Sequence, residues 1–500
     1  MSDDPADGSA AGSVALDSPT GRLVVTTTVA GSAVAMLTAT VVNVALPALA
    51  TDLDASSSQQ QWVVNSYLLT IASLILVGGS LGDRYGRLKI YRIGVAGFAV
   101  ASLACAVAPS VGALIAARLV QGVAGALLTP GSLAIIEATL RPDDRGRGVG
   151  QWSGLSGIAG ALGPLVGGAL VDLSWRWVFV LNVPVAIAVL AMSVRLPESF
   201  DPDAQESRLD LTGAWLTVVV LGGSSYALIE GPPGGWSGLD VGAAVVAVLA
   251  LVGLIVVEPR REHAMVPIDL FGDRVFAAAN LMTLLVYGGM GVVFFLLSIQ
   301  LQVTVGWSPL AAGGALLPIT GLMLVLSSRA GAWAQRVGPR IPLTVGPLLI
   351  AIGMLMYRRV GPDASYLVDV LPGVIVFGLG LSASVAPVTS TALGAAPETR
   401  AGAASGANNA IARTGQLLAV AAIPPLVGLT GDALGDPVEL DDGFRSAMIV
   451  GAALVAAGGV VAATLLPSRR PDDAPVADQP VCCPIDGPAA HAVDVETVDA

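Results

Sequence analysis

The sequence predicts an all-α integral membrane protein whose chain crosses the lipid bilayer fourteen times. Its 500 residues are 54% apolar and only 12% charged. A soluble globular protein carries roughly a quarter charged residues, so this chain has about half the charge that a water-facing surface needs. The composition therefore excludes a water-soluble enzyme, a disordered protein and a nucleic-acid binder, and it indicates the lipid bilayer as the surroundings.

The fourteen spans are read from stretches of apolar residues. A membrane-spanning helix needs about 20 such residues, because the hydrocarbon core is about 30 Å thick. The first stretch follows an acidic leader and has no cleavage site of small residues after it, so we expect a retained helix, not a signal peptide. The stretches are 24–47, 61–82, 89–108, 111–138, 149–171, 176–196, 210–230, 240–258, 275–302, 309–329, 341–358, 366–392, 401–428 and 444–467.

Basic residues set the expected orientation, because cytoplasmic loops of membrane proteins retain Lys and Arg. With residue 1 inside, 19 of the 25 Lys and Arg residues face the cytoplasm and 4 face outward. The other two, Arg118 and Arg413, lie within spans. The composition, with one lysine and abundant Ala, Gly and Val, is typical of a GC-rich bacterial genome. We therefore expect a multi-pass protein of the bacterial cytoplasmic (inner) membrane with both termini in the cytoplasm.

The acidic residues concentrate in two terminal segments. The net charge is −12, and the segments before and after the spans supply −4 and −5 of it. Such segments cannot bury enough apolar surface to fold. We expect residues 1–21 and 468–500 to be disordered acidic cytoplasmic tails.

The cysteine and histidine content indicates no metal site. Cys105 lies in an apolar stretch, whereas Cys482 and Cys483 are adjacent in the second tail. His263 and His491 are the only histidines. No spacing among these residues suits zinc or a disulfide framework, and the tail pair is expected to be incidental, with lipidation or metal binding as alternatives.

Two long polar connections divide the spans into three groups. Residues 197–209 close the sixth span, and residues 259–274 precede the ninth. We expect a first bundle of six helices, two inserted helices and a second bundle of six. The expected boundaries are 22–199, 200–273 and 274–467.

A weak internal repeat supports this division. The loop after the second span reads GGSLGDRYGRLKIYR (78–92), and the loop after the tenth reads AWAQRVGPRIPL (332–343). Each lies in the second loop of a six-helix half, which is the kind of repetition that duplicated transporter halves retain. In this pairing Arg84 matches Arg336 and Gly86 matches Gly338.

Further motifs accompany the repeat. They are TVVNVALP (40–47), QWVVNSYLL (61–69), RLVQGVAGALLTPGS (118–132), GIAGALGPLVGG (157–168), SWRWVFVLNVP (174–184) and FFLLSIQLQVTVGWSPLAAGGALLP (294–318). Together these sequences resemble the major facilitator superfamily, and within it the fourteen-helix drug:proton antiporters, over about residues 22–467. The resemblance implies the major facilitator fold, in which two six-helix bundles enclose a central site and rock to expose it to one side at a time.

This resemblance implies that two sets of residues have mechanical roles in the transport cycle. Small residues in the stretch 149–171 share one helix face and are expected to form a gate that meets the other half, with ordinary small-residue packing as the alternative. The loop 78–92 is expected to act as a latch on the cytoplasmic side, with a purely topological role as the alternative. The gate residues are Gly157, Gly163, Pro164, Gly167 and Gly168. The latch residues are Asp83, Arg84, Gly86, Arg87 and Glu137.

Charged and polar residues inside the membrane are costly and indicate function by default. Arg118 lies seven residues into its span, so about 10 Å deep, and Arg413 lies near the middle of its span. Each arginine is expected to contact the substrate, with a buried strut between helices as the alternative. The full set of expected substrate or coupling residues is Arg118, Gln121, Arg413, Asn43, Asn65 and Thr38.

One position departs from the family pattern. The family carries Asp two residues before the Thr of the T-x-x-N-V-A-L-P stretch, where this chain has Thr38 before Thr40. Some relatives also carry Asp where this chain has Asn65. The sequence places no Asp or Glu near the midplane of the twelve core spans. A proton antiporter needs a titrating group, and the remaining candidates are Asp83, Glu137 and Asp369.

The sequence thus predicts a secondary exporter of a drug or secondary metabolite, with no bound cofactor and driven by the proton gradient. No ATP-binding loop of the G-x-x-x-x-G-K-[ST] type is present. No catalytic residue is identified, so a membrane enzyme is disfavoured, as is a sensor. We expect a monomer whose partners are a small amphiphilic substrate, neutral or anionic, and lipid. The alternative is a transporter of an endogenous anionic or lipid-like metabolite with weak or no proton coupling.

Overall fold

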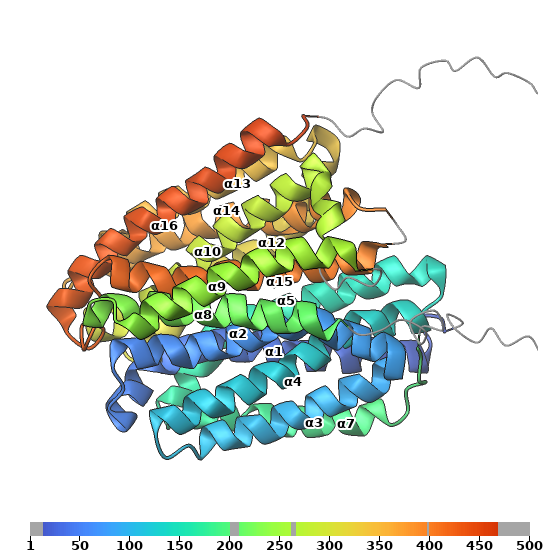
Figure 1. Cartoon of the computed structure of the whole chain (residues 1–500), viewed down its shortest axis with the longest axis horizontal. Helices are drawn as coiled ribbons and strands as arrows, with labels where there is room; N and C mark the ends of the chain where they lie inside the picture. The colour runs from blue at the N-terminus through green and yellow to red at the C-terminus, as the bar shows by residue number, and fades with distance from the viewer. Residues whose placement is uncertain (1–13, 201–209, 262–266, 398–399, 469–500) are drawn as a thin grey trace, which may run out of the picture.

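The computed structural model describes residues 14–200, 210–261, 267–397 and 400–468, which are predominantly helical (Figure 1). Its helices are α1 (Pro19–Leu53), α2 (Ser57–Tyr85), α3 (Arg87–Ala106), α4 (Val111–Thr139), α5 (Pro142–Val171), α6 (Trp177–Val180), α7 (Asn182–Ser193), α8 (Leu211–Gly234), α9 (Gly238–Val257), η2 (Glu258–Arg260), η3 (Ile268–Gly272), α10 (Arg274–Val303), α11 (Pro309–Gly314), α12 (Leu317–Val337), α13 (Arg340–Tyr357), η4 (Tyr366–Val370), α14 (Leu371–Gly394), α15 (Ala401–Leu426) and α16 (Pro437–Leu465).

These helices make fourteen passes, which confirms the fold class that the sequence predicts. Twelve spans are long and apolar enough to cross a bilayer, and in two of them a short helix continues into a longer one, α11 into α12 and η4 into α14. The pair α6 and α7 forms a shorter apolar pass, Trp177–Ser193. The remaining pass is α15, a helix of 26 residues that is long enough to cross a bilayer but is not among those twelve apolar spans.

Side-chain caps fix where several helices begin. At the start of α2, Ser56 Oγ accepts a hydrogen bond from the Gln59 N–H at 3.3 Å, and Gln59 Oε1 accepts from the Ser56 N–H at 3.1 Å. Ser237 and Asp240 form the same reciprocal pair at the start of α9. Such pairs satisfy amide groups that have no partner inside the helix, so they stabilise the first turns of α2 and α9.

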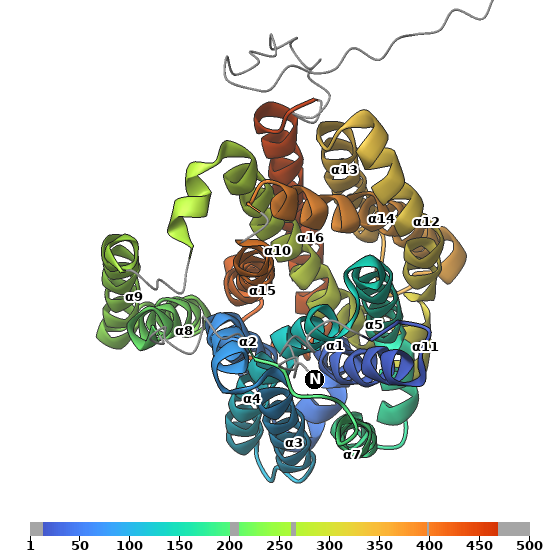
Figure 2. The same cartoon turned by 90° about the vertical axis from the view of Figure 1, so that its right-hand side faces the viewer.

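The passes form two bundles with two additional helices between them in sequence. In the first bundle α4 packs against α2 and α3, and α1 packs against α5 and α7. In the second bundle α10 packs against α15 and α16, and α14 packs against α12 and α13. Figure 2 shows the bundles side by side, with α8 and α9 at the edge of the molecule. The residue boundaries expected for these parts stay predictions, and connector residues 201–209 and 262–266 lie outside the described residues.

The inserted pair covers one side of the junction between the bundles. Helix α8 packs against α9 and also against α2 and α15. Trp62 of α2 donates a hydrogen bond from Nε1 to Glu230 of α8 at 2.8 Å. Helix α9 is largely exposed and apolar, and only 17% of the residues in its most apolar stretch are buried. Its exposed valines, leucines and isoleucines are therefore placed to contact lipid.

The bundles meet at one end and along α2 and α15, whereas other helices of the two bundles diverge toward the opposite end. We call the end where α1 begins and α16 finishes the termini end, and the opposite end the far end. At the far end the Ser57 N–H donates to Gly431 O at 2.7 Å, and Ser57 Oγ accepts from the Leu434 N–H at 3.1 Å. Helix α5 packs against α11 at the same end. In Figure 1, α16 lies near α2 at the far end and diverges from it toward the termini end.

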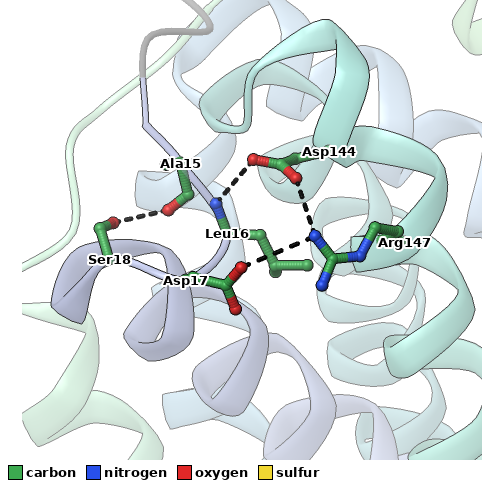
Figure 3. Close-up of polar contacts among 6 residues, drawn as sticks. All are labelled: Ala15, Leu16, Asp17, Ser18, Asp144 and Arg147. Atoms are coloured by element: carbon green, nitrogen blue, oxygen red, sulfur yellow. Dashed lines mark hydrogen bonds and ion pairs between the residues drawn. The ribbon is translucent and has the colours of Figure 1, made fainter.

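The residues before α1 are ordered, which corrects one expectation. Residues 14–21 do not belong to a disordered tail, because α1 begins at Pro19 and Leu16 is buried. The Leu16 N–H donates to Asp144 Oδ2 at 3.0 Å, and Asp17 pairs with Arg147 at 3.6 Å (Figure 3). Burying Leu16 and satisfying its amide on α5 stabilise this segment against solvation. Expected tail residues 1–13 and 469–500 lie outside the described residues.

Candidate functional site

Arg118 lies inside the first bundle and donates two hydrogen bonds within it. Its side chain is 1% exposed. Nε donates to Val63 O at 3.0 Å, and Nη1 donates to Gln121 Oε1 at 2.6 Å. The guanidinium carbon lies 4.4 Å from the centre of the Tyr67 ring, which is a cation–π contact. Arg118 therefore ties α4 to α2, as a strut would; its contact with substrate stays a prediction.

The polar contacts continue from Gln121 across three more helices. Gln121 Nε2 donates to Ser102 Oγ of α3 at 2.7 Å, and Asn182 Nδ2 of α7 donates to the same oxygen at 3.2 Å. Thr38 of α1 donates from Oγ1 to Asn182 Oδ1 at 3.1 Å. These side chains are buried, so the network joins five helices of the first bundle into one unit. Sequence reasoning did not identify Ser102 or Asn182, although Asn182 lies in the motif at 174–184.

Arg413 has a different environment from Arg118. It lies on α15 of the second bundle, is only partly buried, and its Nε has no hydrogen-bond partner among the described residues. Tyr67 of α2 and Tyr287 of α10 both lie within electrostatic range of its charge. Arg413 therefore faces the junction between the two bundles.

Asn65 and Asn43 carry buried atoms without partners. Asn65 is fully buried on α2, and neither its Nδ2 nor its Oδ1 is hydrogen-bonded within the described part of the chain. Asn43 on α1 is 8% exposed, and its Oδ1 is likewise unpaired there. A buried amide without a partner costs about 1–3 kcal/mol. The expected set thus separates into a satisfied network around Arg118 and an unsatisfied group of Asn65, Asn43 and Arg413.

The latch residues lie together at the termini end of the first bundle. Arg87 donates from Nε to Asp83 Oδ1 at 2.7 Å across the break between α2 and α3. Arg84 stacks over Tyr85, with 5.4 Å between the guanidinium carbon and the ring centre. Glu137 of α4 lies within electrostatic range of both Arg87 and Asp83. The structure thus brings the predicted latch residues together, while their latch role stays a prediction.

Gly86 forms the break between α2 and α3. Its φ is +108°, a conformation that L side chains rarely adopt. A Cβ there would lie 3.0 Å from the carboxylate of Glu198, which accepts the Leu88 N–H at 2.8 Å. Sequence reasoning placed Glu198 in a polar connection and missed this capping role. The matching Gly338 of the second half also has a positive φ, +83°, so the repeat is visible in the backbone.

The gate residues of α5 contact two different partners. A Cβ on Gly163 would lie 1.9 Å from Thr40 Oγ1, and one on Gly167 would lie 2.9 Å from Val41, so both glycines pack against α1 of their own bundle. A Cβ on Gly168 would lie 2.4 Å from Pro309 O of the second bundle. A Cβ on Gly313 of α11 would lie 1.9 Å from Pro164 O. At the far end, small residues therefore allow the backbones of the two bundles to touch.

The same face of α5 is free at the termini end. Gly157 lies seven residues before Pro164, so the two residues share a helix face. A Cβ on Gly157 would meet no atom within 4 Å, and neither would one on Gly321 or Gly331 of α12. Together with the far-end contacts, this difference shows bundles that are closed at the far end and parted along α5 and α12 at the termini end.

A surface connection joins the inserted segment to α15. Asp269 of η3 accepts two hydrogen bonds from Arg400, one of them at 3.0 Å. These bonds from Arg400 hold the pKa of Asp269 below its ordinary value. Beside them, Leu270 and Phe276 pack against Ala404 in a small apolar cluster. The connector therefore holds the start of α15 next to the start of α10.

This chain is similar to known proteins both in its sequence and in its fold. Residues 28–420 match the model of the Major Facilitator Superfamily. The tetracenomycin C resistance and export protein of Streptomyces glaucescens is 34% identical over 408 residues, which are 80% of this chain and 75% of the relative. The puromycin resistance protein of Streptomyces alboniger is 36% identical over 408 residues, 80% of this chain and 81% of the relative.

A solved structure confirms the architecture. A D-xylose-proton symporter matches with a TM-score of 0.63 at 15% identity, covering 90% of this chain and 98% of the symporter. At that identity the match concerns the fold alone. With its fourteen passes and its resistance and export relatives, the chain belongs to the Major Facilitator Superfamily of membrane transporters.

Proposed function

We propose that this protein exports a small amphiphilic drug or secondary metabolite across the bacterial cytoplasmic membrane by alternating access. The observation that carries the proposal is the asymmetry of α5. Gly168 meets Pro309 of the second bundle at the far end, whereas Gly157 meets no atom within 4 Å at the termini end. An interface with one closed end and one open end is what a rocking two-bundle transporter requires. The resistance and export relatives support outward transport of such a compound.

The direction of transport depends on which end of the protein faces the cytoplasm. The excess of Arg and Lys in the loops of the termini end supports a cytoplasmic location for that end. The described state is then open to the cytoplasm and ready to receive cargo there. Because one chain contains both bundles, a monomer suffices for the cycle, and no bound cofactor is required.

The proton gradient is the first candidate for the energy source, in keeping with the family resemblance. Asp83, Glu137 and Asp369 would then be the titrating groups to test. A second candidate is transport of an anionic or lipid-like metabolite with weak or no proton coupling. It is favoured by one observation: every Asp and Glu within the described spans lies within six residues of a helix end.

Drug susceptibility and dye efflux in a pump-deficient bacterium test the export function. Cells that express the protein are expected to tolerate more tetracenomycin C or puromycin and to lose a preloaded fluorescent dye faster than vector controls. A protonophore should abolish the difference. A Gly168→Leu variant of equal abundance serves as a matched inactive control, because its side chain would collide with Pro309. Equal susceptibility and dye loss for cells that express the wild type and cells that carry the vector would reject the proposal.

A further inference from the structure

We propose that the cargo carries an anionic group that Arg413 and Asn65 bind between the bundles, and that the electrical membrane potential drives its export. This inference rests on the proposed export function and narrows it to a substrate class and an energy source. The site lies where α15 of the second bundle faces α2 of the first, and Figure 2 shows α15 between α2, α8 and α10.

A polar face of α15 leads from the termini end to Arg413. Ser405, Asn409, Arg413 and Gln416 follow one another at spacings of four, four and three residues, so they share one face. Asn409 is exposed near the termini end, and Arg413 and Gln416 are partly buried further along the helix. Arg413 lies twelve residues after Ala401 and thirteen before Leu426, at the middle of α15. A solute that enters from the open end therefore meets polar side chains up to a guanidinium at mid-depth.

The facing part of α2 supplies buried polar atoms from the first bundle. A Cβ on Gly406 would lie 2.5 Å from Leu76 of α2, and Arg413 follows Gly406 by seven residues on the same face. About three turns along the antiparallel α2 lies Asn65, eleven residues from Leu76 and therefore on the same face of the helix, with Ser66 and Tyr67 beside it in sequence. The Asn65 amide and the Ser66 hydroxyl have no hydrogen-bond partner among the described residues.

Each bundle thus contributes unsatisfied hydrogen-bonding groups on the helix face that carries the contact between α2 and α15. Asn65 is 0% exposed, so bulk water does not satisfy its amide. Arg413 forms no ion pair within the described part of the chain, and its Nε is unpaired there. A ligand with acceptor oxygens would accept from Arg413 and from Asn65 together, whereas an apolar ligand would leave these donors unpaired at a cost.

The charges around the site determine the sign of the ligand. Arg118 and Arg413 both lie within electrostatic range of Tyr67, and the carboxylates of the described spans lie near helix ends. The middle of the junction is therefore positive. A cationic cargo would be repelled there, whereas a carboxylate, sulfonate or phenolate would supply the counter-charge that a partly buried guanidinium lacks.

An anionic cargo also removes the need for a titrating residue. The cytoplasm is electrically negative, so the outward movement of one negative charge releases free energy. At 100 mV this drives an outside-to-inside ratio of about 50-fold, which is about 2.3 kcal/mol per charge. The step carries one anion outward, moves no proton and changes no covalent bond. The placement of every described carboxylate near a helix end is then compatible with energised export.

Purified protein in vesicles tests the inference with two probes of opposite charge, anilinonaphthalenesulfonate and ethidium. A potassium diffusion potential, negative on the side of the termini, is applied at equal pH, and a pH gradient is applied separately at zero potential. We expect the potential alone to accelerate transport of the anion away from the termini side, with a measurable current. Arg413→Gln should weaken anion binding tenfold to a hundredfold, and Arg413→Lys should retain more of it. Arg358→Gln, at an exposed position outside the site, serves as the matched control.

The outcomes separate this inference from the proposed function. Transport of ethidium but not of the anion, or acceleration by the pH gradient alone, would overturn the inference and leave export intact. The same would follow if Arg413→Gln, folded and inserted as judged by its unfolding temperature, bound the anion as tightly as the wild type. If neither probe moves in vesicles and the cellular assay also shows no efflux, the proposed function itself fails.

Discussion

Replacing either Gly157 or Gly168 by leucine is expected to stop transport, but by favouring opposite states. Both residues lie on the face of α5 that points toward the second bundle. At Gly168 a Cβ would lie 2.4 Å from Pro309 O and 2.7 Å from Leu310 Cα, and these backbone atoms cannot turn away as a flexible side chain would. At Gly157 a Cβ meets no atom within 4 Å in the described state. Gly168→Leu therefore disfavours the described state, which is open at the termini end. Gly157→Leu disfavours only the alternative state, in which the termini end is closed.

The size of the effect follows from the contact distances. Overpacking a close interface costs typically 1–3 kcal/mol, and a bias of that size shifts a two-state equilibrium roughly 5- to 150-fold. Gly168→Leu should therefore reduce the population that is open at the termini end by a factor in this range. Gly157→Leu should raise that population, because its side chain obstructs only the alternative state.

A cysteine probe reads the two states directly. Ser153 is exposed on α5 four residues before Gly157, so Ser153→Cys should react with an impermeant maleimide from the termini side. The variant is made in a background without the native cysteines. Labelling should fall with Gly168→Leu and persist with Gly157→Leu. Gly242→Leu, on the lipid-facing α9 with no atom near its Cβ, controls for insertion. Equal labelling in both test variants, or normal efflux by Gly157→Leu, would refute the reasoning.

Three further predictions concern the first bundle and the connector. Arg118→Ala removes buried hydrogen bonds to Val63 O and Gln121, so it should lower stability by about 1–3 kcal/mol; an unchanged unfolding temperature in detergent would contradict the strut. Asp83→Asn removes the charge that pairs with Arg87 and should reduce efflux at normal membrane abundance, whereas unchanged efflux would count against the latch. Hydrogen bonds from Arg400 lower the pKa of Asp269 in the folded protein. The ionised carboxylate therefore stabilises the fold at pH values above 3.8, the pKa in the unfolded chain, and this stabilisation is lost as the pH falls through the lower pKa of the folded protein. Asp269→Asn should therefore flatten the acid side of a plot of unfolding temperature against pH, and superimposable curves would disprove the contribution.

The passes and the repeat could be predicted from sequence because hydropathy and glycine report local requirements. A span needs a certain length of apolar residues, and glycine is favoured where the backbone takes a positive φ, as it does at Gly86 and Gly338. The partners of Arg118 could not be predicted, because Ser102 and Asn182 come from helices whose relative rotation depends on tertiary packing. The ordered segment at Leu16 was missed for a similar reason, since its acceptor on Asp144 is 128 residues away.

The contrast between the two arginines inside the spans, Arg118 and Arg413, connects the fold to the transport cycle. A bundle that moves as a rigid body must satisfy its own interior charges, and the contacts of Arg118 with Val63 and Gln121 stay within the first bundle. A charge that binds cargo must do the reverse, because a guanidinium already paired within its bundle has little affinity left for a ligand. Arg413 meets this condition, since its Nε is unpaired and it faces Tyr67 across the junction. If Arg413 acts in this way, its substitution should alter cargo binding far more than stability, and substitution of Arg118 should do the opposite.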